Sequence, residues 1–307
     1  MRTAFIDQLI KDARINNKVF LIVGDLGFSV VEPFANEFPK QFLNAGVAEQ
    51  NMTGIAAGLA KEGFQVFTYS IANFPTLRAM EQIRYDICYH KLNVNIVSVG
   101  GGYAYGPLGA SHHATEDIGM LRTIPNLTVC APGDPYETKV VTSLIVKHDG
   151  PCYLRLGKAG EPKVVENELN VKFGEMIPLI IGENTAILST GAMLKYSYDF
   201  VLNNRLKWGI YSFPFVKPLD LIGLQLIAEK YENIITIEEH QKSGGFGSAI
   251  LEGINDLIEK GKLENSPIIK RIAIPDKFYS VAGSQAYLRE LAGLRLSTQL
   301  FGNEKII

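Results

Sequence analysis

One carboxylic acid in the sequence stands where it could take part in chemistry. Glu49 lies in the run Asn44–Ala60 (NAGVAEQNMTGIAAGLA), between an expected strand and a helix rich in small residues. In α/β folds the carboxyl ends of parallel strands face the crevice where ligands bind, so an acid at this junction can contact a ligand. Alternatively, Glu49 only satisfies the free backbone N–H groups and the dipole at the start of a helix. Both hypotheses remain open on this run alone.

Two adjacent histidines are the second candidate for chemistry. His112 and His113 follow a glycine-rich stretch. Imidazole can transfer protons near neutral pH, and it can also bind a metal ion. No carboxylate or cysteine stands at a spacing that would complete a metal site, so we expect no metal ligands in this chain. We expect His90, His148 and His240 to be exposed or to lie at helix ends.

The segments that must position these residues alternate between β-branched apolar runs and helical patterns. This alternation is typical of a mostly parallel sheet covered by helices on both faces, and it predicts an α/β fold. An amphipathic helix is expected at the N-terminus. The strands expected in the first half are Val19–Gly24, Gln41–Gly46, Gln65–Ser70, Val94–Gly100, Leu127–Pro132 and Pro151–Gly157, and the helices are Ala48–Gly63, Thr76–Lys91 and Asp134–Gly150.

A polar stretch without periodicity, Glu161–Lys172, divides this pattern from a second α/β pattern. We therefore predict two domains, at residues 1–165 and 179–307, joined by a linker at 166–178. The second half is expected to contain the strands Thr185–Thr190, Trp208–Phe213, Asn233–Glu239 and Ile268–Ile274, and the helices Leu221–Tyr231 and Ser248–Lys260.

Composition limits the class of protein. The chain has 307 residues, of which 47% are hydrophobic and 20% charged, so it can bury a large core. Its net charge of −2 argues against a general nucleic-acid or membrane-surface binder. The N-terminus is unlike a signal peptide, and no apolar run approaches the roughly 18 residues of a membrane span. We expect a cytoplasmic protein in which the three cysteines, Cys88, Cys130 and Cys152, are buried apolar residues.

Several segments together resemble the transketolase family of thiamine diphosphate enzymes. The run Gly46–Gln50 (GVAEQ) is similar to the family stretch that carries the cofactor-activating glutamate, and the similarity continues, in order, over nearly the whole chain. The other similar segments are Glu81–Gly102 (EQIRYDICYHKLNVNIVSVGGG), Gly106–Pro135 (GPLGASHHATEDIGMLRTIPNLTVCAPGDP), Gly150–Lys158 (GPCYLRLGK) and Ile237–Ile250 (IEEHQKSGGFGSAI). The resemblance implies a pyrimidine-binding domain at 1–165 and a transketolase C-terminal domain at 179–307. It also implies transfer of a two-carbon ketol unit from a ketose or ketose phosphate to an aldose.

The resemblance assigns a role to four residues near the cofactor. Glu49 would activate thiamine diphosphate through its aminopyrimidine ring, and Phe74 would pack on that ring. Phe74 stands one residue early relative to Glu81, so a small adjustment of the loop is expected. Asp25 would lie near the cofactor, and His112 would face the reacting oxygens of the substrate and assist proton transfer.

The resemblance also implies a phosphate site for the substrate, with two departures from the family. Arg2, Ser29 and Lys158 align with its phosphate-contacting residues, and a cation–hydroxyl–cation set suits a phosphate dianion. Lys158 replaces an arginine and so loses bidentate geometry. Tyr105 stands where an aspartate is usual, and Leu108–Ala110 are additional residues. The enzyme is therefore expected to act on a sugar outside central carbon metabolism.

One family motif is missing from the chain. The Mg²⁺ that holds the diphosphate needs oxygen ligands from a Gly-Asp-Gly motif and a later Asn, and the sequence contains no Gly-Asp-Gly. We therefore predict that an N-terminal transketolase subunit carries this motif. The chain then resembles the C-terminal half of a split transketolase, paired with a second copy of itself in an α2β2 complex. Alone, it is expected to form at most a dimer without activity.

Other interpretations remain open. The chain could be the beta subunit of a 2-oxoacid dehydrogenase or a deoxyxylulose-phosphate synthase-like protein. A non-catalytic scaffold with the same fold is a further alternative. A dinucleotide-binding protein is disfavoured because no G-x-G-x-x-G follows a first strand.

Overall fold

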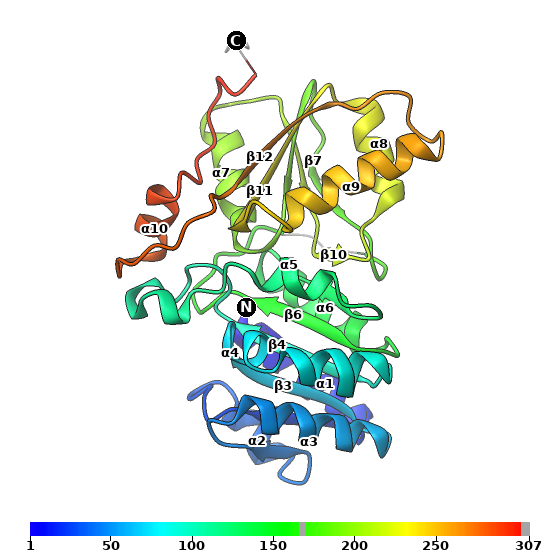
Figure 1. Cartoon of the computed structure of the whole chain (residues 1–307), viewed down its shortest axis with the longest axis vertical. Helices are drawn as coiled ribbons and strands as arrows, with labels where there is room; N and C mark the ends of the chain where they lie inside the picture. Colours follow the sequence, from blue (N-terminus) through cyan, green and yellow to red (C-terminus); the bar gives the residue numbers. More distant parts are fainter. Residues whose placement is uncertain (166–169, 302–307) are drawn as a thin grey trace.

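The computed structural model describes residues 1–165 and 170–301, which form two sheets that are each flanked by helices (Figure 1). The first sheet has seven strands in the order β10-β5-β6-β4-β3-β1-β2. Strands β1 to β6 run parallel to one another, and this confirms the predicted α/β class. The strands are β1 (Val19–Val23), β2 (Phe42–Asn44), β3 (Gln65–Ile71), β4 (Val94–Val99), β5 (Thr128–Cys130), β6 (Cys152–Leu156) and β10 (Phe215–Lys217).

Helices cover both faces of this sheet because side chains along each strand alternate between two cores. Leu21 and Val23 of β1 pack in the cluster that contains α1 and α6, whereas Ile22 packs in the cluster that contains α3 and η1. The helices of the first half are α1 (Arg2–Ile15), α2 (Glu32–Glu37), α3 (Glu49–Lys61), α4 (Phe74–Leu77), α5 (Asp117–Arg122) and α6 (Pro135–Val146), with the π-helix η1 (Gln82–Tyr89) and the 3₁₀ turns η2 (Gly106–Leu108) and η3 (Ala110–His112).

The single helix predicted at Thr76–Lys91 is wrong in detail. The structure has the short α4, a turn at Arg78 and Ala79, and then the π-helix η1. The buried residues of η1 are Ile83, Ile87 and Cys88, four and five positions apart, and three such residues do not distinguish a π-helix from an α-helix in the sequence. The interruption at Arg78 matters, because it gives this residue an exposed position beside the site described below.

The second sheet has five strands in the order β12-β11-β8-β9-β7, and it lies above the first in Figure 1. Strand β7 pairs antiparallel with β9, and the other pairs are parallel. The strands are β7 (Ile177–Ile180), β8 (Thr185–Ser189), β9 (Gly209–Ser212), β11 (Asn233–Gln241) and β12 (Ile268–Ile274), and the helices are η4 (Gly191–Met193), α7 (Leu194–Asn203), α8 (Leu221–Lys230), α9 (Phe246–Glu259) and α10 (Gln285–Leu291).

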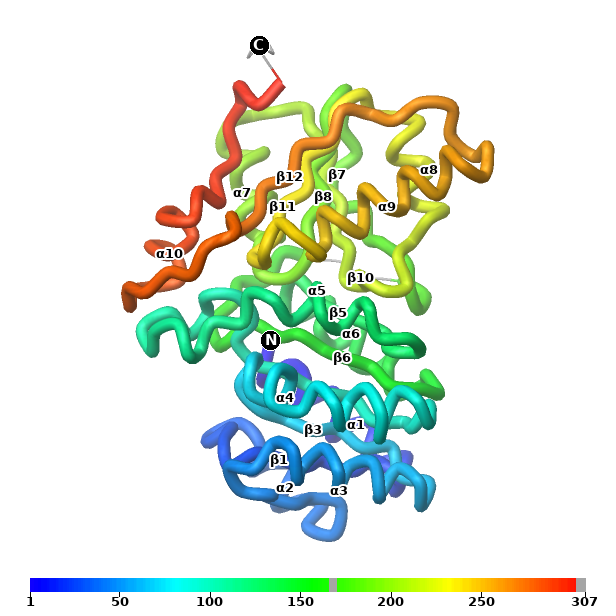
Figure 2. The backbone as a smooth tube through the Cα atoms, viewed as in Figure 1, coloured from blue at the N-terminus to red at the C-terminus, as the bar shows by residue number. Residues whose placement is uncertain are grey.

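The two halves of the chain are not separate in space. Strand β10 belongs to the second half of the sequence, yet it pairs antiparallel with β5 and extends the first sheet. The tube in Figure 2 shows this segment reaching the first sheet from above. Of the expected linker 166–178, residues 166–169 lie outside the described residues, and β7 begins inside it at Ile177.

All three cysteines are buried and unpaired, as predicted. In the part of the chain that the structure describes, each helix is too short or too polar to cross a membrane.

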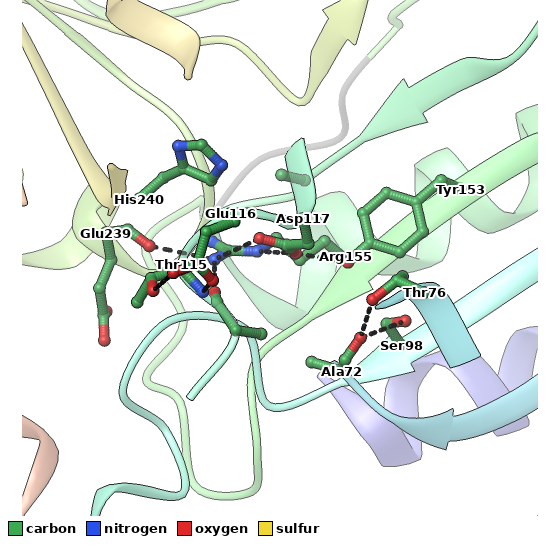
Figure 3. Close-up of polar contacts among 12 residues, drawn as sticks. Ala72, Thr76, Ser98, Thr115, Glu116, Asp117, Tyr153, Arg155, Glu239 and His240 are labelled. Carbon is green, nitrogen blue, oxygen red and sulfur yellow. Dashed lines mark hydrogen bonds and ion pairs between the residues drawn. The ribbon is translucent and has the colours of Figure 1, made fainter. Parts of the chain in front are cut away.

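A buried cation, Arg155, bonds to groups of both halves (Figure 3). The guanidinium of Arg155 on β6 donates through Nε to Asp117 Oδ2 at 2.7 Å, and Tyr153 donates its hydroxyl to the same oxygen at 2.5 Å. Arg155 Nη2 also donates to the carbonyl oxygens of Ala114, at 2.7 Å, and Glu239, at 3.0 Å. Glu239 lies on β11, so one buried cation bonds to groups from both halves.

We predict that Arg155→Met lowers the free energy of unfolding by about 3–5 kcal/mol. Removing the cation leaves the Asp117 carboxylate buried without its counter-charge. Urea denaturation measures the loss. Arg14→Met is the matched control, because Arg14 pairs with Glu37 on the surface and such pairs contribute about 1 kcal/mol or less. Equal losses in the two variants would contradict the assignment.

A second buried acid stands at the start of α6. Asp134 caps this helix by accepting the N–H of Glu137, and its other oxygen accepts the N–H groups of Val164 and Val165 at 2.8 Å each. Glu137 is fully buried, and its Oε2 accepts the N–H of Gly133 at 2.6 Å. Burial raises the pKa of Glu137 to about 7, against the opposing effect of the Gly133 hydrogen bond.

The raised pKa of Glu137 predicts how stability changes with pH. Below about pH 4.5 the acid is protonated in both states, whereas between about pH 4.5 and 7 the folded state holds the proton more tightly. Stability therefore falls as pH rises through this window and levels off above it. Glu137→Gln should remove the part of this fall that Glu137 causes and stabilise the protein at pH 8 by up to about 3 kcal/mol. Unfolding curves at a series of pH values test this, with the exposed Glu81→Gln as control.

Candidate functional site

The candidate site lies where the strand order of the first sheet reverses. The chain passes from β1 outward to β2 and then returns to β3 on the other side of β1. The loops that follow β1 and β2 diverge at such a point, and they leave a crevice at the carboxyl ends of the strands. Asp25 follows β1, and Glu49 is the first residue of α3 after β2, so the topology brings both toward one crevice.

Glu49 is a buried acid with few partners inside its own chain. Its side chain is 3% exposed, and its Oε1 accepts the hydroxyl of Ser70 at 3.2 Å. Gly24 permits this approach, because a Cβ there would lie 3.3 Å from Ser70 Oγ and 3.8 Å from Glu49 Oε1. Its Oε2 lies 3.4 Å from Arg78 Nη1, a long contact with a side chain that is 53% exposed. The carboxylate is thus held in place on one side and only loosely paired on the other.

Two other predicted site residues meet beside Glu49. The rings of Phe74 and His112 pack edge to face with centroids 5.2 Å apart, and the Asn73 side chain donates to the Ser111 carbonyl, which joins their two loops. The guanidinium of Arg78 lies 4.2 Å from the centroid of the Phe74 ring. Phe74 is the first residue of α4, and its ring lies beside the histidine loop; the loop adjustment expected from the resemblance stays a prediction.

Asp25 is exposed at the end of β1. Its backbone has φ of 54°, and its Oδ1 accepts Asn44 Nδ2 at 3.0 Å. Asn44 Oδ1 in turn accepts the N–H groups of Asp25 and Gly46. These bonds fix the two loops that border the crevice, so Asp25 is placed at its rim.

A cluster of cations and tyrosines lies beyond this rim. Tyr105 packs over Gly100, where a Cβ would lie 2.1 Å from the ring, and the Lys158 Nζ lies 6.0 Å from the ring centroid. Burial raises the pKa of Tyr105, and the hydrogen-bonded guanidinium of Arg2 partly opposes that rise. Arg2 likewise opposes the burial that raises the pKa of Tyr69. Arg2 and Lys158, predicted to act together, are therefore linked through Tyr105.

Ser29 is less directly connected to this cluster. Its side chain is exposed, and its backbone N–H donates to Glu32 Oε1 at 2.8 Å. The loop that carries it touches the cluster at Gly27, where a Cβ would lie 3.0 Å from the ring of Tyr69. The structure thus places Ser29 on the same loop system, but no direct contact with Arg2 or Lys158 is seen among the described residues.

The loop that carries His112 is held by the second half of the chain. Glu239 on β11 is buried and accepts the N–H of Tyr103 at 2.6 Å, and it also accepts Gln285 and Arg289. Gly283 donates its N–H to the carbonyl of Gly106 at 3.2 Å, so the segment before α10 also packs against this loop (Figure 1).

His113 and His240 are structural residues. His113 is 8% exposed and packs edge to face on Tyr103, and burial lowers its pKa. The expectation that His240 is exposed or at a helix end is wrong. It is 1% exposed, its Nε2 accepts the N–H of Gly119 at 3.0 Å, and its Nδ1 lies 2.9 Å from the Gln241 carbonyl (Figure 3).

Sequence reasoning missed three side chains that shape the site: Ser70, Arg78 and Glu239. Ser70 lies at the end of β3 next to β1, and the parallel strand order alone could have placed it near Glu49. Glu239 comes from the second domain, and its contact with Tyr103 depends on how the two halves pack. Arg78 gives no signal in the sequence, because its role arises from the break between α4 and η1.

Comparison with known proteins settles the family. The family model described as "Transketolase, pyrimidine binding domain" matches residues 1–161, and that described as "Transketolase, C-terminal domain" matches residues 177–295. The chain belongs to the transketolase family. It is 35% identical over 281 residues to an apulose-4-phosphate transketolase subunit from Phocaeicola vulgatus, and the match covers 90% of this chain and 88% of that protein.

Two further transketolases support this membership. The chain is 37% identical over 286 residues to a putative transketolase C-terminal section of Methanocaldococcus jannaschii, covering 91% of this chain and 87% of that one. A solved structure described as a split gene transketolase, inactive beta4 tetramer, superposes with a TM-score of 0.83 and 31% identity over 95% of this chain and 93% of that chain. The predicted likeness to the C-terminal half of a split transketolase is confirmed.

Proposed function

We propose that this transketolase chain supplies the pyrimidine-binding half of a shared active site. The assembled enzyme transfers a two-carbon ketol unit from a ketose or ketose phosphate to an aldose acceptor. The observation that carries the proposal is the buried Glu49 carboxylate, which the guanidinium of Arg78 links to the Phe74 ring beside His112. A flat, hydrogen-bond-donating guanidinium already fits between the carboxylate and the phenylalanine ring.

The residues at this position suit the aminopyrimidine of thiamine diphosphate, which is also flat and offers hydrogen-bond donors. When bound, the cofactor supplies a nucleophilic carbon and an electron sink. Glu49 would hold the ring through its Oε2, while the Ser70 hydroxyl keeps Oε1 in place. Phe74 would pack against the ring, and Asp25 would border the cofactor at the rim of the crevice.

His112 is the candidate for proton transfer at the oxygens of the substrate. It is half-buried, its Nδ1 lies 3.0 Å from the Ser111 hydroxyl, and its ring is fixed against Phe74. An oriented imidazole beside the cofactor site can hold or move a proton near neutral pH.

The diphosphate and its Mg²⁺ would be held by a separate N-terminal subunit. The sequence lacks Gly-Asp-Gly, and large apolar side chains in segments that border the site are exposed to solvent, namely Phe28, Val47 and Leu77. Exposed apolar groups around an incomplete site are suited to a partner surface. We therefore propose an α2β2 complex in which a pair of these chains binds two N-terminal subunits. We also propose that this chain alone is inactive.

The cluster of Arg2, Tyr105 and Lys158 is the proposed site for the anionic end of the substrate, with Ser29 at its edge. Two cations beside one tyrosine, Arg2 at its hydroxyl and Lys158 over its ring, can bind a phosphate through charge-assisted hydrogen bonds. Because Tyr105 replaces an acid and Lys158 an arginine, we propose that the enzyme accepts a sugar other than the usual substrates of central metabolism.

Reconstitution tests the proposed function. We predict that this chain, combined with the N-terminal transketolase subunit, thiamine diphosphate and Mg²⁺, transfers ketol units between sugar phosphates. Glu49→Gln should fold and assemble normally, yet lower kcat at least about 100-fold, because the amide cannot provide the charged acceptor. Glu81→Gln, which changes an exposed acid, is the control.

The same assay separates the alternatives. Wild-type activity in Glu49→Gln would contradict the role of this carboxylate. Decarboxylation of 2-oxoacids with an artificial electron acceptor, without ketol transfer, would indicate a 2-oxoacid dehydrogenase. Condensation of pyruvate with an aldose phosphate would indicate a deoxyxylulose-phosphate synthase-like enzyme.

A second prediction concerns the anion site. Arg2→Met should raise KM for a phosphorylated ketose by about 10- to 100-fold with a smaller change in kcat, because a charge-assisted hydrogen bond is lost. KM for an unphosphorylated ketose should change little. Arg14→Met, on the exposed face of the same helix, is the matched control. Equal effects of Arg2→Met on both donors would contradict a phosphate site.

A further inference from the structure

Arg78 lies between Glu49 and Phe74, the two residues that are proposed to bind the pyrimidine ring of the cofactor. Its Nη1 is 3.4 Å from Glu49 Oε2, and its guanidinium carbon lies 4.2 Å from the centroid of Phe74. The edge of the Phe74 ring contacts His112. One side chain therefore touches the carboxylate and covers the aromatic face at the same time.

The guanidinium of Arg78 has the same properties as the pyrimidine ring that is proposed to bind between Glu49 and Phe74. It is planar, it donates hydrogen bonds along its edge, and it stacks on aromatic rings. A buried carboxylate without a counter-charge is costly, and Ser70 gives Glu49 only a neutral hydrogen bond. Arg78 thus offsets the charge of Glu49 in the chain as it stands.

The Arg78 side chain can also move away from Glu49 and Phe74. Arg78 is 53% exposed, and its contact with Glu49 is long. Its backbone is fixed, because its carbonyl accepts Gln50 Nε2 at 2.9 Å from α3, so a change of rotamer moves the guanidinium without disturbing α4. Although the Glu49 carboxylate is buried, the exposure of the guanidinium to solvent and the long contact make this a weak pair that can exchange.

We propose that Arg78 is a placeholder for the cofactor. In the free subunit its guanidinium occupies the space between Glu49 and Phe74, and it turns out toward solvent when the pyrimidine ring of thiamine diphosphate enters. This inference rests on the proposed function. Its consequence is that Glu49 keeps a partner before cofactor binding, at the cost of a lower affinity for the cofactor.

Calorimetric titration of the reconstituted complex with thiamine diphosphate and Mg²⁺ tests the proposal. Arg78→Met should lower Kd by about two- to tenfold, because the cofactor no longer displaces an existing ion pair. Arg78→Lys keeps the charge but loses the planar stack, so its Kd should lie between those of the wild type and Arg78→Met. Arg84→Met is the matched control, because Arg84 pairs with exposed Glu81 on the neighbouring helix, and its Kd should be unchanged.

Thermal unfolding of the free chain provides a readout that does not involve the cofactor. Arg78→Met should lower Tm, because Glu49 loses its counter-charge, and the loss should disappear in the Glu49→Gln background. Stability and affinity should therefore change in opposite directions.

The outcomes separate the two proposals. If the wild-type complex binds the cofactor but the Arg78→Met complex binds it equally well or more weakly, the proposed role of Arg78 is wrong, and the proposed function stands. A weaker Kd would mean that Arg78 is itself a cofactor ligand. If the wild type and all variants fail to bind the cofactor, both the proposed function and the proposed role of Arg78 are wrong.

Discussion

The burial of the Glu49 carboxylate is the constraint on which the site depends. A charge with 3% exposure must be compensated by nearby groups, and the chain provides one hydroxyl and one half-exposed guanidinium. The position of the acid follows from the fold, because β1 lies at the reversal of the strand order and α3 begins beside it. A site that is only loosely paired on one side is suited to a ligand that brings its own donors, and we propose that this ligand is thiamine diphosphate, the cofactor that membership of the transketolase family implies.

The second domain contributes to the site through position and not through reactive groups. Two of its buried polar side chains, those of Glu239 and His240, hold the first domain. Glu239 accepts the N–H of Tyr103, and His240 accepts the N–H of Gly119, while Arg155 of the first domain bonds to the Glu239 carbonyl. These contacts fix both ends of the loop that carries His112. Loss of the second domain would therefore release this loop, although the described residues of that domain act on the proposed cofactor site only through it.

The sequence predicted β1 to β6, β8, β9, β11 and β12, because β-branched runs between helical patterns leave few alternatives, but it missed β7 and β10. It failed where a contact between distant segments decides the structure. Strand β10 is three residues long and exists because β5 offers it hydrogen bonds across the domain boundary. Glu49 could be selected from its place between strand and helix, whereas its assignment, like those of Phe74 and His112, needed the resemblance to a family. Arg78 could not be found, because its contacts depend on a break in a helix that periodicity predicts to be continuous.

The start of α9 shows why a glycine-rich turn is not by itself a ligand site. The turn Gly244–Ser248 opens this helix, and the free N–H groups of Phe246 and Gly247 point to the buried carboxylate of Glu238. Burial raises the pKa of Glu238, against the opposing effects of nearby His240 and of the two N–H groups. The chain thus fills the anion position at α9 with its own acid. At α3 the arrangement is reversed. The acid, Glu49, is itself the first residue of the helix, and its Oε2 contacts only the exposed guanidinium of Arg78. We propose that this difference makes the start of α9 structural and the start of α3 functional.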